Sequence, residues 1–213
     1  MDACKFLICV SAFCLFQLSC NTPTSNKHIA TPVKLKQHEI KASNETVVIE
    51  IVPLQQFTDD LPVYLEKGLQ VYFDSVVILP ERTLPVSSYN KTRKRINADS
   101  VLQLLSLAPS PHYRLGLTAI DIYTRKGASQ EWGVFGLSLC PGKASVVSPF
   151  RLNRKRYKEQ LLKVALHELG HAYGLEHCSN KTCVMRDAGG KNHCDEERTF
   201  CSGCSRRLNT FIH

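Results

Sequence analysis

Three histidines and a glutamate in the segment His167–Cys178, HELGHAYGLEHC, have the spacing of a catalytic metal site. His167 and His171 are four residues apart, so on a helix both imidazoles project from one face and reach the same zinc ion. Gly174 lets the chain leave the helix in a conformation that most residues resist, which brings back His177 as a third ligand. Three histidines leave the fourth zinc position open for water, as in catalytic sites. Glu168 lies beside them and is the candidate general base.

The simplest alternative is that these are ordinary polar residues of a helix. A lone His-Glu-x-x-His arises by chance, but Gly174 and His177 at the matching spacing make coincidence rare. A second alternative is a zinc-stabilised binding or scaffold protein with an inactive or vestigial site. Glu168 argues against it, because a glutamate in the zinc cleft is needed for chemistry and not for metal retention. We therefore predict an enzyme that activates water at zinc.

The positions of the cysteines indicate a second metal site. The chain has ten cysteines, of which four precede residue 21. Five of the other six lie in the last 36 residues, around and after the histidine segment. This crowding favours a local metal cluster over a disulfide framework for the whole domain. Cys140 and Cys194 are open to three interpretations: buried thiols, a mutual disulfide, or alternate ligands of the cluster.

The N-terminal segment has the pattern of an export signal. Residues 1–19 combine one lysine with an apolar run that is too short to span a bilayer. Cys20 is a candidate lipidation site, and ordinary signal-peptide cleavage nearby is the alternative. Residues 20–45 are polar, contain prolines, and are predicted to form a flexible tether. The expected product is an exported, membrane-anchored bacterial lipoprotein, or otherwise a periplasmic or secreted protein.

The net charge of +8 is concentrated in two basic clusters, within residues 91–95 and 151–158. A solvated basic surface is the simple explanation, and an anionic membrane or an acidic substrate is the alternative. No nucleic-acid-binding motif accompanies the charge, so no nucleic-acid partner is expected. The oligomeric state is unknown at this point, and a monomer is assumed.

The elements that must position the motif follow from hydrophobic periodicity and from prolines and glycines. Strands are expected at residues 46–52, 75–79, 115–124, 132–139 and 144–148, and helices at 60–73, from 97 or 99 to 107, and at 153–173. On the last helix Val164, His167 and His171 should face a cleft, while a separate apolar stripe faces the sheet: Leu162, Ala165, Leu166, Leu169 and Tyr173. This order predicts an α+β domain, residues 46–213, in which a mixed twisted sheet carries packed helices.

Beyond His177 the sequence reads CSNKTCVM from Cys178 to Met185 and then CSGC from Cys201 to Cys204. With these residues the chain resembles the metzincin clan of zinc peptidases, and within it the archaemetzincin family. The resemblance implies a zinc metallopeptidase of metzincin-like fold, with an upper subdomain at 46–174, an active-site helix and a small zinc-bound C-terminal subdomain at 175–213. The sequence departs from the family in Arg186–Phe200, which carries the additional His193 and Cys194.

The resemblance also assigns roles to residues outside the histidine motif. Met185 would lie in a turn beneath the catalytic metal as a packing residue. A second, structural zinc would be held by four thiolates, Cys178, Cys183, Cys201 and Cys204, with two disulfides as the alternative. Two zinc ions are thus expected. The substrate would be a peptide or protein that pairs with the strand at 132–139. Surface positions are expected for the remaining histidines: His28, His38, His112, His193 and His213.

Overall fold

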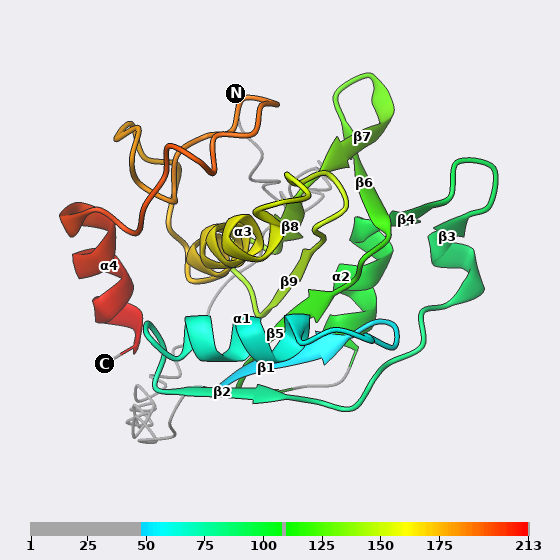
Figure 1. Ribbon diagram of the computed structural model, residues 1–213, viewed down its shortest axis with the longest axis horizontal. Coiled ribbons are helices and arrows are strands. Elements are labelled where there is room, and N and C mark those ends of the chain that lie inside the picture. The colour runs from blue at the N-terminus through cyan, green and yellow to red at the C-terminus, as the bar shows by residue number, and fades with distance from the viewer. Residues whose placement is uncertain (1–47, 108–109, 213) are drawn as a thin grey trace, which may run out of the picture. The chain divides into compact units, whose positions relative to one another are not determined.

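The computed structural model describes residues 48–107 and 110–212. Its larger sheet has five strands in the order β2-β1-β5-β9-β8 (Figure 1). In that order the strands are Ser75–Ile78, Val48–Pro53, Tyr113–Leu117, Ala144–Val147 and Gly136–Ser138. Neighbouring strands are parallel, except that β8 runs antiparallel to β9. The sheet is therefore mixed, as predicted, and β8 forms one of its edges.

Helices cover both faces of this sheet. Successive strand residues point to opposite sides, so the apolar strands present buried side chains to both faces. On one face α1 (Leu61–Leu69) and α3 (Tyr157–Ala172) pack with Ile51 and Val147. On the other face α2 (Ala98–Ser106) packs with Val52 and Val146. The α3 helix lies against β8 and β9, which places the histidine motif beside the sheet edge (Figure 1).

A second sheet, with strand order β3-β4-β6-β7, was not predicted. Its strands are Tyr89–Asn90, Arg95–Asn97, Asp121–Lys126 and Ser129–Val134, and a short 3-10 helix, Val86–Ser88, precedes it. The predicted strands at 115–124 and 132–139 are each wrong as single strands, since they divide into β5 with β6 and β7 with β8. Apolar residues that are buried or partly buried continue across both divisions into adjoining cores, so periodicity alone did not reveal where the chain changes sheet.

Two helix starts show how local residues set the boundaries. The α2 helix begins as predicted, and the Asn97 side chain accepts a hydrogen bond from the backbone N–H of Ser100 at 3.2 Å. The α3 helix begins at Tyr157 and not near Asn153, so most of the basic run precedes it. Within this run, Arg156 pairs with carboxylates of its own helix and of a later segment, Glu159 at 3.0 Å and Asp195 at 3.1 Å.

The α4 helix, Ser202–Ile212, is also absent from the prediction. Its sequence is polar, and Leu208 and Cys204 are its buried residues among those described. The predicted signal segment, Cys20 and the tether lie outside the described residues. Within the described residues, no helix has both the length and the apolar character needed to cross a membrane.

Candidate active site

The α3 helix and the turn after it bring together the three predicted histidines. The Nε2 atom of His171 lies 3.0 Å from Nε2 of His167 and 3.2 Å from Nε2 of His177. Gly174 has a φ of +88°, and this left-handed residue turns the chain so that His177 faces back to the helix. The predicted role of Gly174 as the residue that ends the helix is confirmed.

Backbone carbonyls fix the orientation of two of these imidazoles. The Nδ1 atoms of His167 and His171 lie 2.6 Å from the Val184 oxygen and 2.7 Å from the Leu175 oxygen. A proton on each Nδ1 donates to its carbonyl and leaves the Nε2 lone pair directed into the triad. Burial lowers the pKa of both histidines to about 4, so both rings are neutral near pH 7.

The triad fits a zinc ion by chemistry and by size. Neutral Nε2 atoms that converge without a proton between them repel one another unless a cation is present. With zinc–nitrogen bonds of about 2.1 Å, tetrahedral ligands lie about 3.4 Å apart, close to the observed separations. Within the described residues, two groups of three or more histidine, cysteine, aspartate or glutamate residues have their ligand atoms within 4.8 Å of one another. One is the histidine triad, and the other is the group of four cysteines.

Glu168 is held at the triad by strand β8. It is 8% exposed, and burial raises its pKa, whereas a hydrogen bond from Ser138 lowers it. The Ser138 hydroxyl lies 2.7 Å from Oε2 of Glu168 and 2.9 Å from the hydroxyl of Ser145. Gly136 makes room for the carboxylate, because a Cβ at this position would lie 2.5 Å from Cγ of Glu168.

Met185 is fully buried under α3, in agreement with its expected position. A Cβ on Gly170 would lie 2.4 Å from the Met185 sulfur, so the glycine permits this close packing. The residue before Met185 is Val184, whose carbonyl accepts the hydrogen bond from His167. The methionine turn therefore supports the triad through its backbone as well as through its side chain.

The four predicted cysteines also meet in one place. Cys178 and Cys201 have sulfurs 3.7 Å apart, and the Cys201 N–H donates to the Cys183 sulfur at 3.2 Å. A zinc site with bonds of about 2.3 Å has sulfur–sulfur edges of about 3.8 Å, which matches this separation. No disulfide joins any two of the described cysteines, so neither the two disulfides of the alternative nor a Cys140–Cys194 disulfide is present.

The structure places the remaining predicted residues outside both ligand sets. Cys194 is a buried thiol, and Cys140 is half-buried in the wall of the cleft that contains the triad. His193 is paired with Glu196 at 3.3 Å and lines a pocket beside the triad, and this position was not expected. His112 accepts from the backbone N–H of Val48 at 3.4 Å. Positions 28, 38 and 213 lie outside the described residues.

Sequence reasoning missed the residues that support the motif from a distance: Ser138, Gly136 and Gly170. The first two lie on the predicted strand at 132–139, but the sequence contains no local signal that links them to Glu168. Gly170 lies within the motif, and a glycine inside a predicted helix is a hint of close packing.

Comparison with known proteins shows similarity across the region that carries both ligand sets. The profile of Peptidase family M54 matches residues 66–210. An archaemetzincin of Archaeoglobus fulgidus is 33% identical over 164 residues, covering 75% of this chain and 98% of that protein. An archaemetzincin of Haloquadratum walsbyi is 29% identical over 180 residues, covering 76% of this chain and 99% of that protein.

Solved structures give the same result for the fold. The crystal structure of an archaemetzincin from Methanopyrus kandleri has a TM-score of 0.66 at 28% identity, covering 78% of this chain and 95% of that one. The crystal structure of the archaemetzincin from Archaeoglobus fulgidus, complexed with malonate, has a TM-score of 0.65 at 32% identity, covering 76% of this chain and 99% of that one.

Proposed function

Because this chain belongs to Peptidase family M54, the archaemetzincin family of zinc-dependent metallopeptidases, we propose that it hydrolyses extended peptide segments with Glu168 as general base. The observation that carries the proposal is the position of the Glu168 carboxylate beside the converging Nε2 atoms of the histidine triad. When bound there, zinc supplies a Lewis acid that acidifies water and polarises a carbonyl.

The remaining chemistry belongs to side chains of this chain. Glu168 accepts a proton from the attacking water and returns it to the leaving amine. Burial raises the pKa of Glu168, which makes its carboxylate a stronger proton acceptor. The Ser138 hydroxyl donates to Oε2 and leaves Oε1 free to handle the proton.

Strand β8 supports the proposal that the substrate binds in an extended conformation. Among the described strands it pairs with β9 alone, and it lines the cleft that contains His167, Glu168 and His177. An extended peptide that hydrogen-bonds to its open edge would place backbone carbonyls along this cleft. The binding strand is shorter than the sequence suggested, because Trp132 and Gly133 belong to β7 in the second sheet.

The two zinc ions have different roles in this proposal. The histidine site has three protein ligands and faces the cleft, as catalysis requires. The cysteine site has four ligands and is closed, so its metal is structural: it ties α4 to the segment that carries Met185. One chain supplies every ligand of both sites, which supports a monomer as the working unit.

We also propose that the chain is exported and anchored through a lipid on Cys20, on the basis of residues 1–20 alone. Mass spectrometry of the N-terminal peptide from the membrane fraction tests this: a diacylated Cys20 is expected. A free N-terminus near Cys20 in a soluble fraction would indicate ordinary cleavage instead.

The decisive experiment for the activity is cleavage of a broad peptide library by the zinc-loaded protein. Glu168→Gln should abolish cleavage and retain zinc, because the general base does not ligate the metal. Glu176→Gln changes an exposed glutamate of the same segment and is the matched control. Equal cleavage by Glu168→Gln and the unaltered protein would refute the mechanism, and zinc retention without turnover in the unaltered protein would favour a scaffold.

A further inference from the structure

A pocket of about 310 Å³ opens beside the histidine triad. His167, Glu168 and His177 line one side of it, and residues between Arg186 and Glu197 line the other. A peptide whose scissile bond lies at Glu168 can therefore direct a neighbouring side chain into this pocket.

Glu197 is the unusual residue of this pocket. Glu197 lines the pocket and is only 8% exposed. Within the described residues, no hydrogen bond or close ion pair reaches its carboxylate. Burial raises the pKa of Glu197 to about 7, although the more distant charges of Arg186 and Lys163 oppose the rise. A buried carboxylate without a partner destabilises the fold, and such a group is therefore a candidate for a functional role.

The lysines and arginines that line the pocket are either paired with carboxylates outside it or exposed to solvent. Three cations that line the pocket pair with carboxylates outside it: Lys163 with Glu159 at 3.0 Å, Arg186 with Glu196 at 2.7 Å, and Arg151 with Asp121 at 2.6 Å. Asp121 also pairs with Arg95 at 2.9 Å. Lys126 and Lys191 also line the pocket, but both are exposed to solvent. Of the two buried carboxylates that line the pocket, Glu168 accepts a hydrogen bond from Ser138, whereas Glu197 has no hydrogen bond or close ion pair within the described residues.

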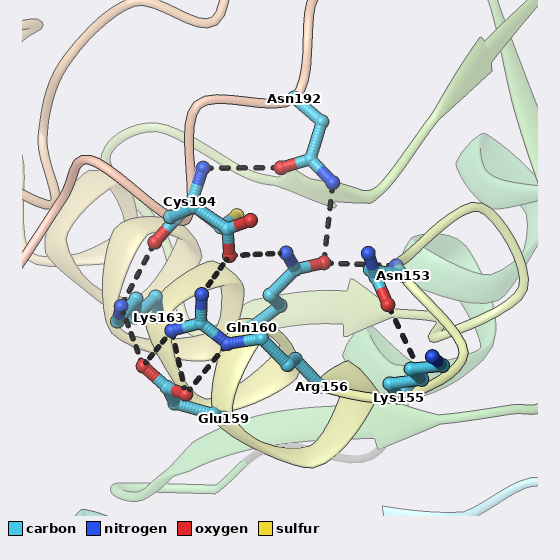
Figure 2. Close-up of polar contacts among 9 residues, drawn as sticks. Asn153, Lys155, Arg156, Glu159, Gln160, Lys163, Asn192 and Cys194 are labelled. Carbon is cyan, nitrogen blue, oxygen red and sulfur yellow. Dashed lines mark hydrogen bonds and ion pairs between the residues drawn. The ribbon is translucent and has the colours of Figure 1, made fainter.

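A polar network holds this wall of the pocket against α3 (Figure 2). The buried Gln160 donates to Asp195 Oδ1 at 2.7 Å and accepts from the Asn192 amide at 3.2 Å. Lys163 donates to the carbonyl of Cys194 at 2.8 Å. The segment that carries the carboxylate is thus ordered before any ligand arrives, which favours tight and selective binding.

We propose that this pocket is the subsite for a lysine or arginine side chain of the substrate, and that Glu197 selects it. This proposal rests on the peptidase function above. An ammonium or guanidinium group would supply the missing partner of the carboxylate. A neutral side chain would leave the carboxylate unpaired, and an acidic one would add repulsion.

Matched peptides test the selectivity. The residues on either side of the scissile bond are varied in turn, comparing arginine with citrulline and lysine with norleucine, which differ mainly in charge. At one of these two positions, the kcat/KM of the cationic peptide should be at least about tenfold higher than that of its neutral counterpart. Glu197→Gln should bring this ratio close to one, whereas Glu81→Gln, which removes a charge from an exposed glutamate outside the pocket, should preserve it. A ratio near one at both positions in the unaltered protein overturns the proposal without any variant.

A binding measurement separates this proposal from the activity on which it rests. Zinc-loaded Glu168→Gln protein is titrated with N-acetyl-arginine amide and with N-acetyl-citrulline amide and followed by NMR. The arginine probe should bind at least about tenfold more tightly, and adding Glu197→Gln should remove the difference. Selective binding without turnover in the unaltered protein would refute the peptidase function and retain the subsite. Turnover without selectivity would refute the subsite alone.

Discussion

The hydroxyl of Ser138 lies 2.7 Å from Oε2 of Glu168, although the two residues are 30 positions apart in the chain. One residue lies on an edge strand and the other on the active-site helix. This hydrogen bond fixes which carboxylate oxygen is free to exchange a proton. It also links the strand proposed to bind substrate to the group proposed to act on it.

Replacing Ser138 by alanine should therefore lower kcat about tenfold and change KM little, because the carboxylate loses its orientation and not its contact with substrate. Ser138→Thr keeps the hydroxyl and should recover most of the activity. Steady-state kinetics on one cleaved peptide provides both parameters. A change confined to KM would show that Ser138 contacts the substrate and does not position the base.

Gly136→Ala should reduce peptide cleavage by at least about tenfold while the protein remains folded and retains zinc. The added methyl group would lie 2.5 Å from Cγ of Glu168, so the side chain must move away from the triad. Gly203→Ala is the matched control, since no atom lies within 4 Å of its added methyl group. Normal kinetics for Gly136→Ala would mean that the position of Glu168 is less restricted than the packing indicates.

The two zinc sites should depend on each other in one direction. Cys178 follows His177 directly, and Val184, next to Cys183, accepts the hydrogen bond from His167. Losing the cysteine-bound metal frees backbone that orients the histidine site, because the binding energy of a structural zinc is folding energy. The histidine ligands give no comparable support to the cysteines, since α3 packs on the sheet independently.

Elemental analysis checks this directly on protein prepared under reducing conditions. We expect about two zinc ions per chain in the unaltered protein and about one in the double variant His167→Ala, His171→Ala. At limiting zinc, the zinc content of the Cys201→Ser variant should fall below one ion per chain. Cys194→Ser changes a buried thiol outside both sites and should retain both metals. Loss of both metals from the histidine variant would contradict the one-way dependence.

Stability should fall as the pH rises from about 4.5 to about 7 because of Glu197. In the unfolded chain this carboxyl ionises near its ordinary pKa of 4.5, whereas in the fold burial raises the pKa to about 7. Between these values the unfolded state has released a proton that the folded state still holds, so unfolding becomes more favourable with rising pH. The neighbouring charges act on the pKa of Glu197 in both directions: the positive charges of Arg186 and Lys163 lower it, and the negative charge of Glu196 raises it.

Glu197→Gln should accordingly increase the free energy of unfolding above pH 7 by roughly 1–3 kcal/mol and have little effect below pH 4.5. Urea unfolding at several pH values measures this difference, with Glu81→Gln, at an exposed glutamate, as the control for net charge. Destabilisation by Glu197→Gln at neutral pH would show that the carboxylate already has a stabilising partner within the fold.

The metal ligands could be predicted from the sequence because their geometry is local. His167 and His171 share a helix face, Gly174 turns the chain, and the closely spaced pairs Cys178 with Cys183 and Cys201 with Cys204 bring two sulfurs together each. Helix periodicity and turn geometry act over a few residues, so spacing alone limits where these side chains can lie. The family resemblance then supplied the combination of the four cysteines into one zinc site and the role of Met185.

The supporting residues depended on tertiary packing. Ser138 reaches Glu168 because the chain leaves β7, changes sheet and returns as the edge strand against α3, and no local pattern marked that change. Glu197 resembles its neighbours Asp195 and Glu196 in sequence, yet it alone among them is buried, since Gln160 holds the segment in one orientation on the helix. Contacts over 30 or more positions depend on how whole elements pack, and that packing decides which identical side chains meet solvent and which face the site.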